Sequence, residues 1–312
     1  METITLGSNG PTVAPLGIGT WAWGDRLFWS YGNEYDASEL QDAFKTALEL
    51  GIHFFDTAEI YGFGESERLL GQFMQQTQQP IQIATKYMPL PWRFNADAVA
   101  DALTASLRRL QLPIVTLYQV HQPFDFFMGQ KTLMNALANE VKQGRILTVG
   151  VSNYSAEQMR QAHKILGDRG IPLVVNQVQY SLLARQIESN GVLETARELG
   201  ITILAYSPLA QGLLTGKYTR ENYIEPTGVR RLDPRFSRSG LEKIVPVITV
   251  LQTIGEKYER TPAQVALNWL ISQNVIPIPG AKNSHQVRQN VGALGWTLSE
   301  EEVAQIDQIT RP

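Results

Sequence analysis

The sequence contains no cysteine among its 312 residues. This absence excludes disulfides, thiolate zinc sites, iron–sulfur clusters and a cysteine nucleophile. No apolar run approaches the ~18 residues that a membrane span requires. The first residues have neither the basic segment nor the apolar segment of a signal peptide. We therefore expect a cytoplasmic protein with no membrane partner.

An excess of charge of one sign is also lacking. The chain has 27 Lys+Arg against 30 Asp+Glu, a net charge of -3. Binding to nucleic acid requires a basic face, so no nucleic-acid partner is expected. The HExxH motif is missing, and four scattered histidines do not predict a metal site. Hydrophobic residues supply 43% of the chain, which is sufficient for a packed core.

What is present is a regular alternation. Short β-branched and apolar runs alternate with longer segments of helical period. Eight strands, each followed by a helix, close a (β/α)8 TIM barrel, so we expect one α/β domain over residues 1–312. The expected strands are 16–20, 53–56, 82–86, 116–120, 147–151, 173–178, 202–206 and 275–279. The expected helices are 38–50, 65–75, 96–110, 131–143, 156–166, 186–199, 241–258 and 262–272.

Additions to the barrel are expected at its two ends. Residues 3–6 and 13–15 flank Asn9-Gly10, a pair typical of hairpin turns, which predicts an N-terminal β-hairpin. The irregular stretch 207–240 predicts a long functional loop at the C-terminal face. A doubly wound sheet is the alternative fold. It would place a glycine-rich dinucleotide turn after the first strand, and residues 21–25 (WAWGD) do not fit one.

Four reactive side chains fall at strand ends, where barrel active sites lie. Asp56 ends the second expected strand, Lys86 ends the third, His121 follows the fourth, and Tyr61 follows Asp56 closely. A lysine ammonium beside a phenol lowers the tyrosine pKa, and a histidine can orient a carbonyl oxygen. This set predicts proton donation from Tyr61 to a carbonyl. Lys86 as the Schiff-base nucleophile of an aldolase barrel is an alternative.

Longer motifs carry a family resemblance. GIHFFDTAEIYGFGESERLLG, YQVHQP, GVSNYS, NQVQYS, AYSPLAQGLLTGKY and IPIPGAKNSHQVRQN follow one another along the chain. Together they resemble the aldo-keto reductase superfamily, and the opening GTWAWGD and NVIPIPGAKN are similar to its cyanobacterial and plant plastid, pyridoxal-reductase-like branch. The resemblance implies a catalytic tetrad of Asp56, Tyr61, Lys86 and His121, and NADP(H) bound without a Rossmann turn.

The same resemblance implies three groups of cofactor contacts. The nicotinamide would meet Ser152, Asn153 and Gln177 at its carboxamide and Tyr206 at its ring. The pyrophosphate would lie along Ser207, Pro208, Leu209, Gln211 and Lys217. The adenosine end would meet Gly280, Lys282, Gln286, Gln289 and Asn290, with free N–H groups at the helix start 284–286 for a phosphate. Gln289 departs from the family, which often has Glu there. Lys282 is our candidate for the 2′-phosphate, with Arg230 or Arg288 as helpers.

Aromatic residues predict the character of the substrate. Trp21, Trp23, Trp92 and Phe124 fall on loops where family members line the substrate pocket, which favours aromatic or hydrophobic aldehydes. Arg26 and Arg93 could instead meet an anionic group. The sequence thus predicts NADPH-dependent reduction of aldehydes or ketones to alcohols. The alternative is a sensor or regulatory subunit that binds NADPH with little turnover.

Overall fold

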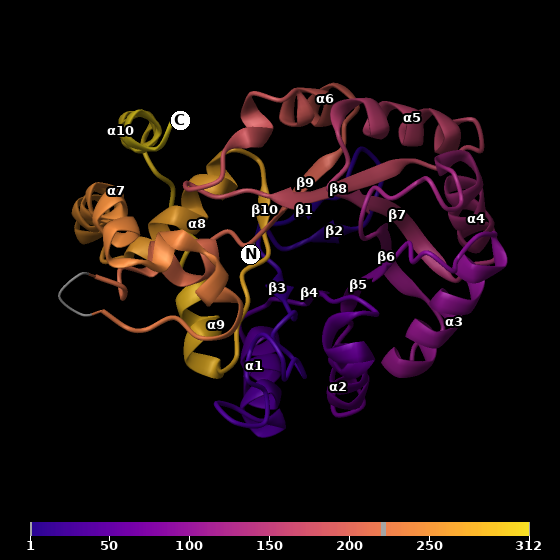
Figure 1. The fold of residues 1–312 in the computed structure, drawn as a ribbon, viewed down its shortest axis with the longest axis horizontal. Coiled ribbons are helices and arrows are strands. Elements are labelled where there is room, and N and C mark those ends of the chain that lie inside the picture. Colours follow the sequence, from indigo (N-terminus) through magenta and orange to yellow (C-terminus); the bar gives the residue numbers. More distant parts are fainter. Residues whose placement is uncertain (1, 220–222, 312) are drawn as a thin grey trace.

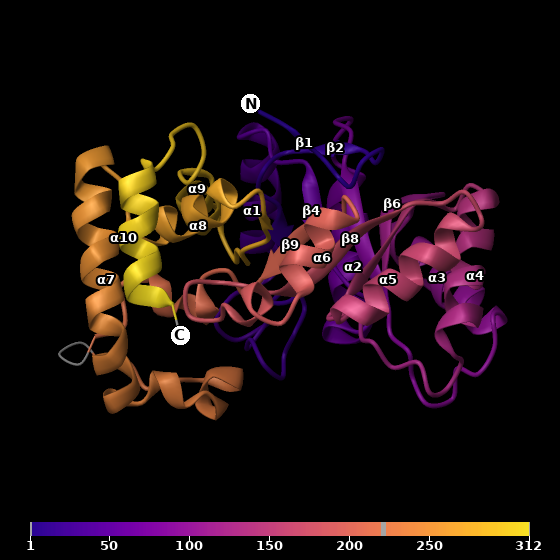
Figure 2. The ribbon, with the colours of Figure 1, turned by 90° about the horizontal axis from the view of Figure 1, so that it is seen from above.

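The computed structural model describes residues 2–219 and 223–311, which form a β-hairpin followed by a (β/α)8 barrel (Figures 1 and 2). The barrel strands are parallel and lie side by side in chain order. They are β3 (Ile18–Gly19), β4 (Phe54–Asp56), β5 (Gln82–Tyr87), β6 (Val115–Val120), β7 (Ile146–Ser152), β8 (Leu173–Gln179), β9 (Thr202–Tyr206) and β10 (Ile276–Pro277). The predicted fold is confirmed, although its first and last strands have only two residues each.

Helices surround this sheet. They are α1 (Ala37–Glu49), α2 (Glu65–Met74), α3 (Asp97–Leu110), α4 (Gln130–Lys142), α5 (Ala156–Gly167), α6 (Val192–Glu198), α7 (Arg238–Tyr258), α8 (Pro262–Ser272), α9 (Ser284–Val291) and α10 (Glu300–Thr310). Four of them begin with a capping box, which satisfies backbone N–H groups at the helix start. Among the described residues, no helix is long and apolar enough to cross a membrane.

The helices differ from expectation in three respects. Helices α1 and α7 begin one and three residues before their expected starts, with Asp36 and Ser237 as their N-caps. The helix expected over 186–199 is interrupted: a 3₁₀ turn, η2 (Gln186–Glu188), precedes α6, and between them Gly191 has φ 82°. Helix α10 lies beyond the predicted set. The capping box formed by Ser299 and Glu302 is a sequence signal that would have predicted the start of this helix.

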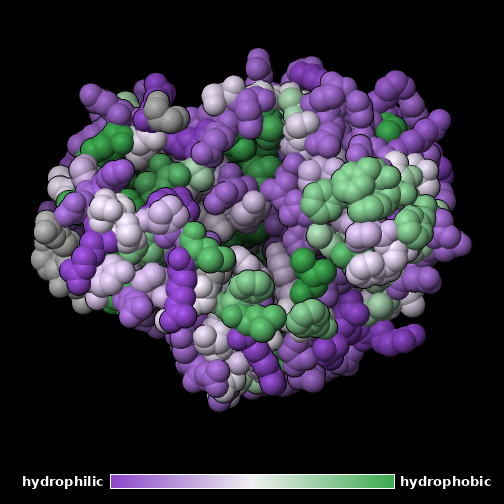
Figure 3. Space-filling view, viewed as in Figure 1, coloured by the Kyte–Doolittle hydropathy of each residue, from purple (hydrophilic) through white to green (hydrophobic). Residues whose placement is uncertain are grey.

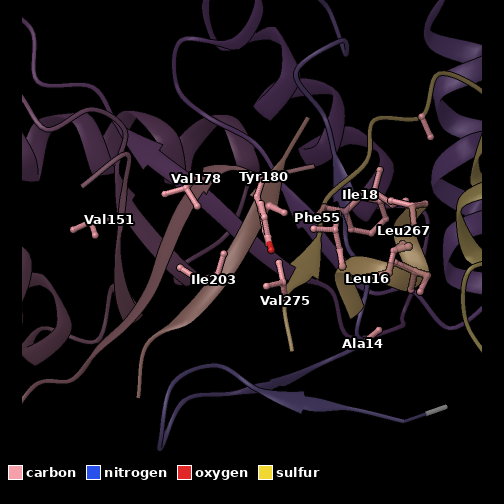
Figure 4. Packing of buried hydrophobic residues seen from close by; sticks show 14 of the residues in the cluster. Ala14, Leu16, Ile18, Phe55, Val151, Val178, Tyr180, Ile203, Leu267 and Val275 are labelled. Carbon is pink, nitrogen blue, oxygen red and sulfur yellow. The ribbon is translucent and has the colours of Figure 1, made fainter. Parts of the chain in front are cut away.

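The core has two layers. An inner cluster fills the barrel and includes Phe54, Leu117 and Leu204. The N-terminal hairpin of β1 (Ile4–Thr5) and β2 (Thr12–Val13) adds Leu6, directly after β1, and Val13, in β2. The hairpin therefore closes the N-terminal end of the barrel. A larger outer cluster lies between the sheet and the helices. Figure 4 shows part of it, with side chains from β4, β9 and α8.

The barrel closes where its first and last strands meet. Gly17 N–H donates to Pro277 O and Gly19 N–H donates to Pro279 O, each at 3.0 Å. A Cβ on Gly19 would lie 2.7 Å from the Ile278 carbonyl oxygen, so glycine permits this close approach. The closure brings the loop after β10 beside the loop after β3, near the C-terminal face.

Irregular segments lie at that face, as expected. The described parts of the stretch 207–240 contain three short 3₁₀ helices, η3 (Ala210–Thr215), η4 (Gly228–Leu232) and η5 (Pro234–Phe236). The face seen in Figure 3 has a central hollow with hydrophobic side chains gathered around it.

Candidate active site

The inward positions of four barrel strands change from apolar to polar toward their C-terminal ends. Successive inward side chains are two residues apart in a strand. The apolar member of each pair belongs to the inner core cluster, and the polar member stands above it. The pairs are Phe54 and Asp56, Ala84 and Lys86, Leu117 and Gln119, and Val175 and Gln177. The polar members therefore form a layer directly above the barrel core.

Lys86 lies at the centre of this layer. Its fully buried ammonium donates to Asp56 Oδ2 at 2.5 Å, to Thr57 O at 2.7 Å and to Tyr61 Oη at 3.3 Å. The His121 ring stands edge-on to the Tyr61 ring, with their centroids 5.6 Å apart. The four residues expected to form a tetrad thus come together around one phenol.

Asp56 is held by two amides. Gln177 Nε2 donates to Asp56 Oδ1 at 2.7 Å, and Gln119 Nε2 donates to the same oxygen at 3.1 Å. Gln119 was not predicted to belong to the site. The available signal was its position two residues before His121, because alternate residues of a strand share a face. Both carboxylate oxygens of Asp56 are therefore engaged by buried donors.

Burial sets the proton affinity of Tyr61. Desolvation raises the pKa of its phenol, and the nearby Lys86 ammonium only partly opposes that rise. The expectation of a lowered tyrosine pKa is therefore wrong for this structure, because the sequence does not disclose how deeply the hydroxyl is buried. A phenol with a raised pKa remains protonated at neutral pH and can act as a proton donor.

Burial and neighbouring charges also set the pKa values of Lys86 and His121. Burial lowers the pKa of Lys86, but Asp56 and Tyr61 outweigh it and the net shift is upward, which keeps the ammonium charged. Burial lowers the pKa of His121 to about 3, and the Lys86 charge adds to the effect. The imidazole is therefore neutral near pH 7, so it can donate one N–H to a substrate oxygen.

A tight turn presents Tyr61 to this layer. Tyr61 begins the 3₁₀ segment η1 (Tyr61–Gly64), in which Gly62 and Phe63 both have φ 55°. A Cβ on Gly62 would lie 2.7 Å from Gly24 O. The glycine therefore allows the turn after β4 to pack against the loop after β3.

The residues expected at the nicotinamide lie beside the tetrad. Tyr206 Oη donates to Asn153 Oδ1 at 3.1 Å, and Asn153 Nδ2 lies 3.4 Å from His121 O. Ser152 is buried and donates to Gln177 O at 2.9 Å. Gln177 Nε2 donates to Asp56 Oδ1 at 2.7 Å, so this side chain links the expected nicotinamide contacts to the tetrad.

The loop after β9 begins with strained backbone. Ser207 and Gln211 have φ 50° and 57°, Pro208 is buried, and Leu209 packs against the outer core. The Gln211 Oε1 atom is buried without a hydrogen-bond partner among the described residues. Arg230 Nε donates to Gln211 O at 3.1 Å. Lys217 is exposed, with its ammonium 4.8 Å from the Tyr218 ring centroid.

Lys282 lies where the barrel closes. Its side chain is 17% exposed, its ammonium donates to Trp29 O at 3.1 Å, and it stands 4.1 Å from the Tyr35 ring centroid. Within the described part of the chain, the carboxylate that it approaches is Glu34, at 3.9 Å. Burial lowers the pKa of Lys282 to about 8, with Arg230 among the cations that add to the effect. A largely buried cation in this setting suits an anionic ligand.

Helix α9 borders the same region. Its first turn is less open than expected, because Asn283 caps Gln286 N–H at 3.0 Å and the Gln286 side chain accepts from Lys282 N–H at 2.8 Å. Asn290 Nδ2 donates to Gly280 O at 3.3 Å. Gln289 Oε1 accepts from Thr261 Oγ1 at 3.4 Å. Arg288, the other expected helper, is exposed and 3.9 Å from Glu49 Oε2.

The expected aromatic wall is only partly formed. Trp21 lies beside Tyr61 with ring centroids 6.4 Å apart, and Trp92 and Phe124 are exposed. Trp23 is wrong as a pocket residue: it is fully buried against Phe55 and Phe73, and its Nε1 donates to Ala281 O at 2.8 Å. An indole without exposed surface cannot line a pocket.

Two further groups bear on the site. Arg26 is exposed, whereas Arg93 forms an ion pair with Glu59 at 2.5 Å. In the described part of the chain, no group of three or more His, Asp or Glu side chains could hold a metal ion.

Comparisons with known proteins agree with this geometry. The model of the aldo/keto reductase family matches residues 15–311. The chain is 40% identical over 308 residues to the chloroplastic pyridoxal reductase of Arabidopsis thaliana, covering 95% of this chain and 83% of the relative. It is 32% identical over 312 residues to an aldo-keto reductase [NADP(+)] of Schizosaccharomyces pombe, covering 95% and 88%.

A solved structure gives the same result. The glycerol dehydrogenase of Gluconobacter oxydans superposes with a TM-score of 0.86 at 28% identity, covering 98% of this chain and 94% of that one. The fold, the extent of the family match and the similarity to these relatives lead to one conclusion. The chain belongs to the aldo/keto reductase family.

Proposed function

We propose that this protein reduces aldehydes or ketones to alcohols with NADPH, and that Tyr61 donates the proton. The observation that carries the proposal is the buried Lys86 ammonium, which joins the Asp56 carboxylate to the Tyr61 hydroxyl. When bound, NADPH supplies a hydride to the carbonyl carbon. The carbonyl oxygen then gains negative charge and takes the Tyr61 proton.

Each tetrad residue has a defined task in this proposal. Tyr61 holds the proton that moves to the substrate oxygen. Lys86 stabilises the phenolate that remains, because its charge is retained by Asp56. His121, neutral near pH 7, donates a hydrogen bond that orients the carbonyl oxygen beside the phenol.

The residues present fit a phosphorylated dinucleotide. The largely buried Lys282 ammonium lies in a segment expected to hold the cofactor. So does Gln211 Oε1, which is buried with no hydrogen-bond partner among the described residues. Lys282, assisted by Arg230, would hold the 2′-phosphate. Tyr206 and Asn153, which contact one another beside His121, would hold the nicotinamide. The NADP(+) in the name of the fission-yeast relative supports the same preference.

The substrate side supports an uncharged, aromatic or hydrophobic carbonyl compound. Trp21 offers an indole face beside Tyr61, and the Arg93 charge is already paired with Glu59. The pyridoxal reductase relative makes pyridoxal a sensible first aldehyde to test.

The sequence left two alternatives, a Schiff-base aldolase that uses Lys86 and a sensor that binds NADPH. Schiff-base chemistry at Lys86 requires a neutral amine, whereas its ammonium is bonded to three oxygens and its pKa is raised. A sensor that binds NADPH with little turnover would retain the same tetrad, so only turnover distinguishes it.

The decisive experiment combines binding with turnover. NADPH and NADH are titrated by fluorescence, and NADPH absorbance is then followed against pyridoxal and 4-nitrobenzaldehyde. We expect preferential NADPH binding and measurable reduction. Tyr61→Phe should retain NADPH binding but lose about 10²–10⁴-fold in kcat, the usual share of a positioned acid. Binding without turnover in the wild type would favour the sensor, and an active Tyr61→Phe variant would disprove the proton donor.

A further inference from the structure

The position of Tyr61 relative to Lys86 is not determined by their own contact. The Lys86 ammonium makes shorter bonds to Asp56 Oδ2 and Thr57 O, at 2.5 and 2.7 Å, than to Tyr61 Oη, at 3.3 Å. All three acceptors lie in one segment, at the end of β4 and in the loop that follows. The lysine is therefore anchored at residues 56–57, and the path of residues 58–61 decides where the phenol stands.

Glu59 lies within that path, two residues before Tyr61. Its Oε1 accepts from Met88 N–H at 2.7 Å and from Arg93 Nη1 at 2.5 Å, and its Oε2 accepts from Arg93 Nη2 at 2.9 Å. Arg93 Nη1 also donates to Met88 O at 2.8 Å. One bidentate ion pair thus binds both the N–H and the C=O of Met88, which lies two residues after Lys86.

The surroundings make this pair rigid. The Glu59 side chain is 8% exposed and the Arg93 side chain 17%. The Arg93 guanidinium stands 4.9 Å from the centroid of the buried Tyr87 ring. A bidentate guanidinium–carboxylate pair is directional, and solvent screens it little at this degree of burial. Neither group contacts Tyr61 or the ammonium of Lys86 in the contacts described, so any effect on them passes through the backbone.

We propose that the Glu59–Arg93 ion pair clamps the loop after β4 to the loop after β5 and so holds the Tyr61 hydroxyl at the Lys86 ammonium. Glu59 and Arg93 are then positioning residues. The inference rests on the proposed function for its kinetic meaning. The clamp itself is a statement about geometry and can be tested without turnover.

The first test measures the phenol directly. The ionisation of Tyr61 is followed by NMR of isotope-labelled tyrosine ζ carbons, with its resonance assigned from Tyr61→Phe. The charged or titratable groups facing it are Asp56, Lys86, His121 and Tyr206. In Glu59→Gln we expect the Tyr61 pKa to rise, because the phenol moves away from Lys86. Loss of the Glu59 charge alone would lower it, so an unchanged or lowered pKa overturns the proposal.

The second test measures turnover. Glu59→Gln should lower kcat about 10–100-fold, as a small displacement of a catalytic group does, and leave the Kd for NADPH unchanged. The matched control is Glu140→Gln, which removes the carboxylate of the Glu140–Arg145 pair, also largely buried and beside the start of β7. The control should leave kcat and the Tyr61 titration unchanged.

A double variant separates positioning from an unpaired buried charge. Glu59→Gln with Arg93→Met removes both charges, and its folding is checked by thermal melting. If the clamp positions Tyr61, the folded double variant remains slow and its Tyr61 pKa remains raised. Recovery of wild-type kcat would overturn the proposal. A wild type that reduces no carbonyl would instead refute the proposed function, while the NMR titration still decides the clamp.

Discussion

At the scale of single residues, His121 connects burial to the pH dependence of stability. Its pKa of about 3 lies below the ordinary value of 6.5. Between these pH values the unfolded chain binds a proton that the folded chain does not. The free energy of unfolding therefore falls as pH decreases from 6.5 to 3, by up to about 1.4 kcal/mol per pH unit.

We expect His121→Gln to remove that part of the slope. Chemical denaturation between pH 3.5 and 7 measures this slope. The range covers most of the interval between the two pKa values, about 3 and 6.5. His285→Gln, at an exposed position of α9, controls for replacing an imidazole by an amide. Equal slopes in wild type and His121→Gln would show that His121 becomes charged within the folded protein.

Lys282 predicts a pH dependence of NADPH affinity, at alkaline rather than acidic pH. With a pKa of about 8, its amine is charged below that pH and neutral above it. We expect NADPH affinity to fall by up to about tenfold per pH unit above 8, with little change for NADH. Lys282→Ala should abolish this difference, measured as Kd ratios between pH 7 and 9.5, which bracket the value of about 8. A pH-independent ratio in the wild type would contradict the role in 2′-phosphate recognition.

Single residues also show how far sequence carries the prediction. Asp56, Lys86 and His121 are found together because strand ends in a barrel converge, a rule that needs no coordinates. Trp23 was misassigned, since a tryptophan on a loop near the site can equally pack inward. The direction of the Tyr61 pKa was missed because desolvation depends on what covers the hydroxyl.

At the scale of elements, the backbone conformation of the turn η1 determines the position of Tyr61. Gly62 has φ 55°, and an added Cβ would lie 2.7 Å from Gly24 O. Gly62→Ala should therefore cost more than the ~1–2 kcal/mol of left-handed backbone alone, and it should lower kcat by displacing Tyr61. Thermal melts and initial rates measure the two effects.

The control for this turn is Gly170→Ala. Gly170 has φ 73° but no heavy atom within 4 Å of its added Cβ, so it reports only the conformational cost. A Gly62→Ala variant that matches Gly170→Ala in stability, with full activity, would show that the loop after β3 moves aside.

Element boundaries were predicted well where caps and periodicity agree. Helix α8 matches its expected range, with Thr261 as N-cap and Pro262 as its first residue. The strands at the barrel seam, β3 and β10, are shorter than expected. Their hydrogen bonds depend on partners from opposite ends of the chain, which local sequence patterns do not reveal. Gln119 was missed because its contact with Asp56 joins two separate strands, although its spacing of two residues from His121 places both on one strand face.

At the scale of the whole molecule, α10 is fastened to the barrel by a buried charge network. Arg185 Nη1 pairs with Asp307 at 2.9 Å, Trp269 Nε1 donates to Asp307 at 3.1 Å, and Arg185 also pairs with Glu188. Asp307→Ala should reduce stability by about 1–3 kcal/mol, because Trp269 Nε1 loses its acceptor while Arg185 retains Glu188 and Thr310. It should leave kcat unchanged. Asp168→Ala, in an exposed pair with Lys164, should change stability by less than ~0.5 kcal/mol.

Denaturant unfolding and steady-state rates of both variants test this separation. A large loss of kcat in Asp307→Ala would mean that the outer helices support the tetrad after all.

The closure of the barrel has a consequence for synthesis of the chain. Trp23 meets Ala281, and Trp29 meets Lys282, only when the ends of the barrel join. A chain still on the ribosome and shorter than about 280 residues therefore has neither the Lys282 site nor a partner for the open edges of β3 and β9. Such edges invite pairing with other chains. Formation of the Lys282 site thus coincides with removal of the aggregation-prone edges, so the proposed NADPH ligand would selectively stabilise molecules whose barrel has closed.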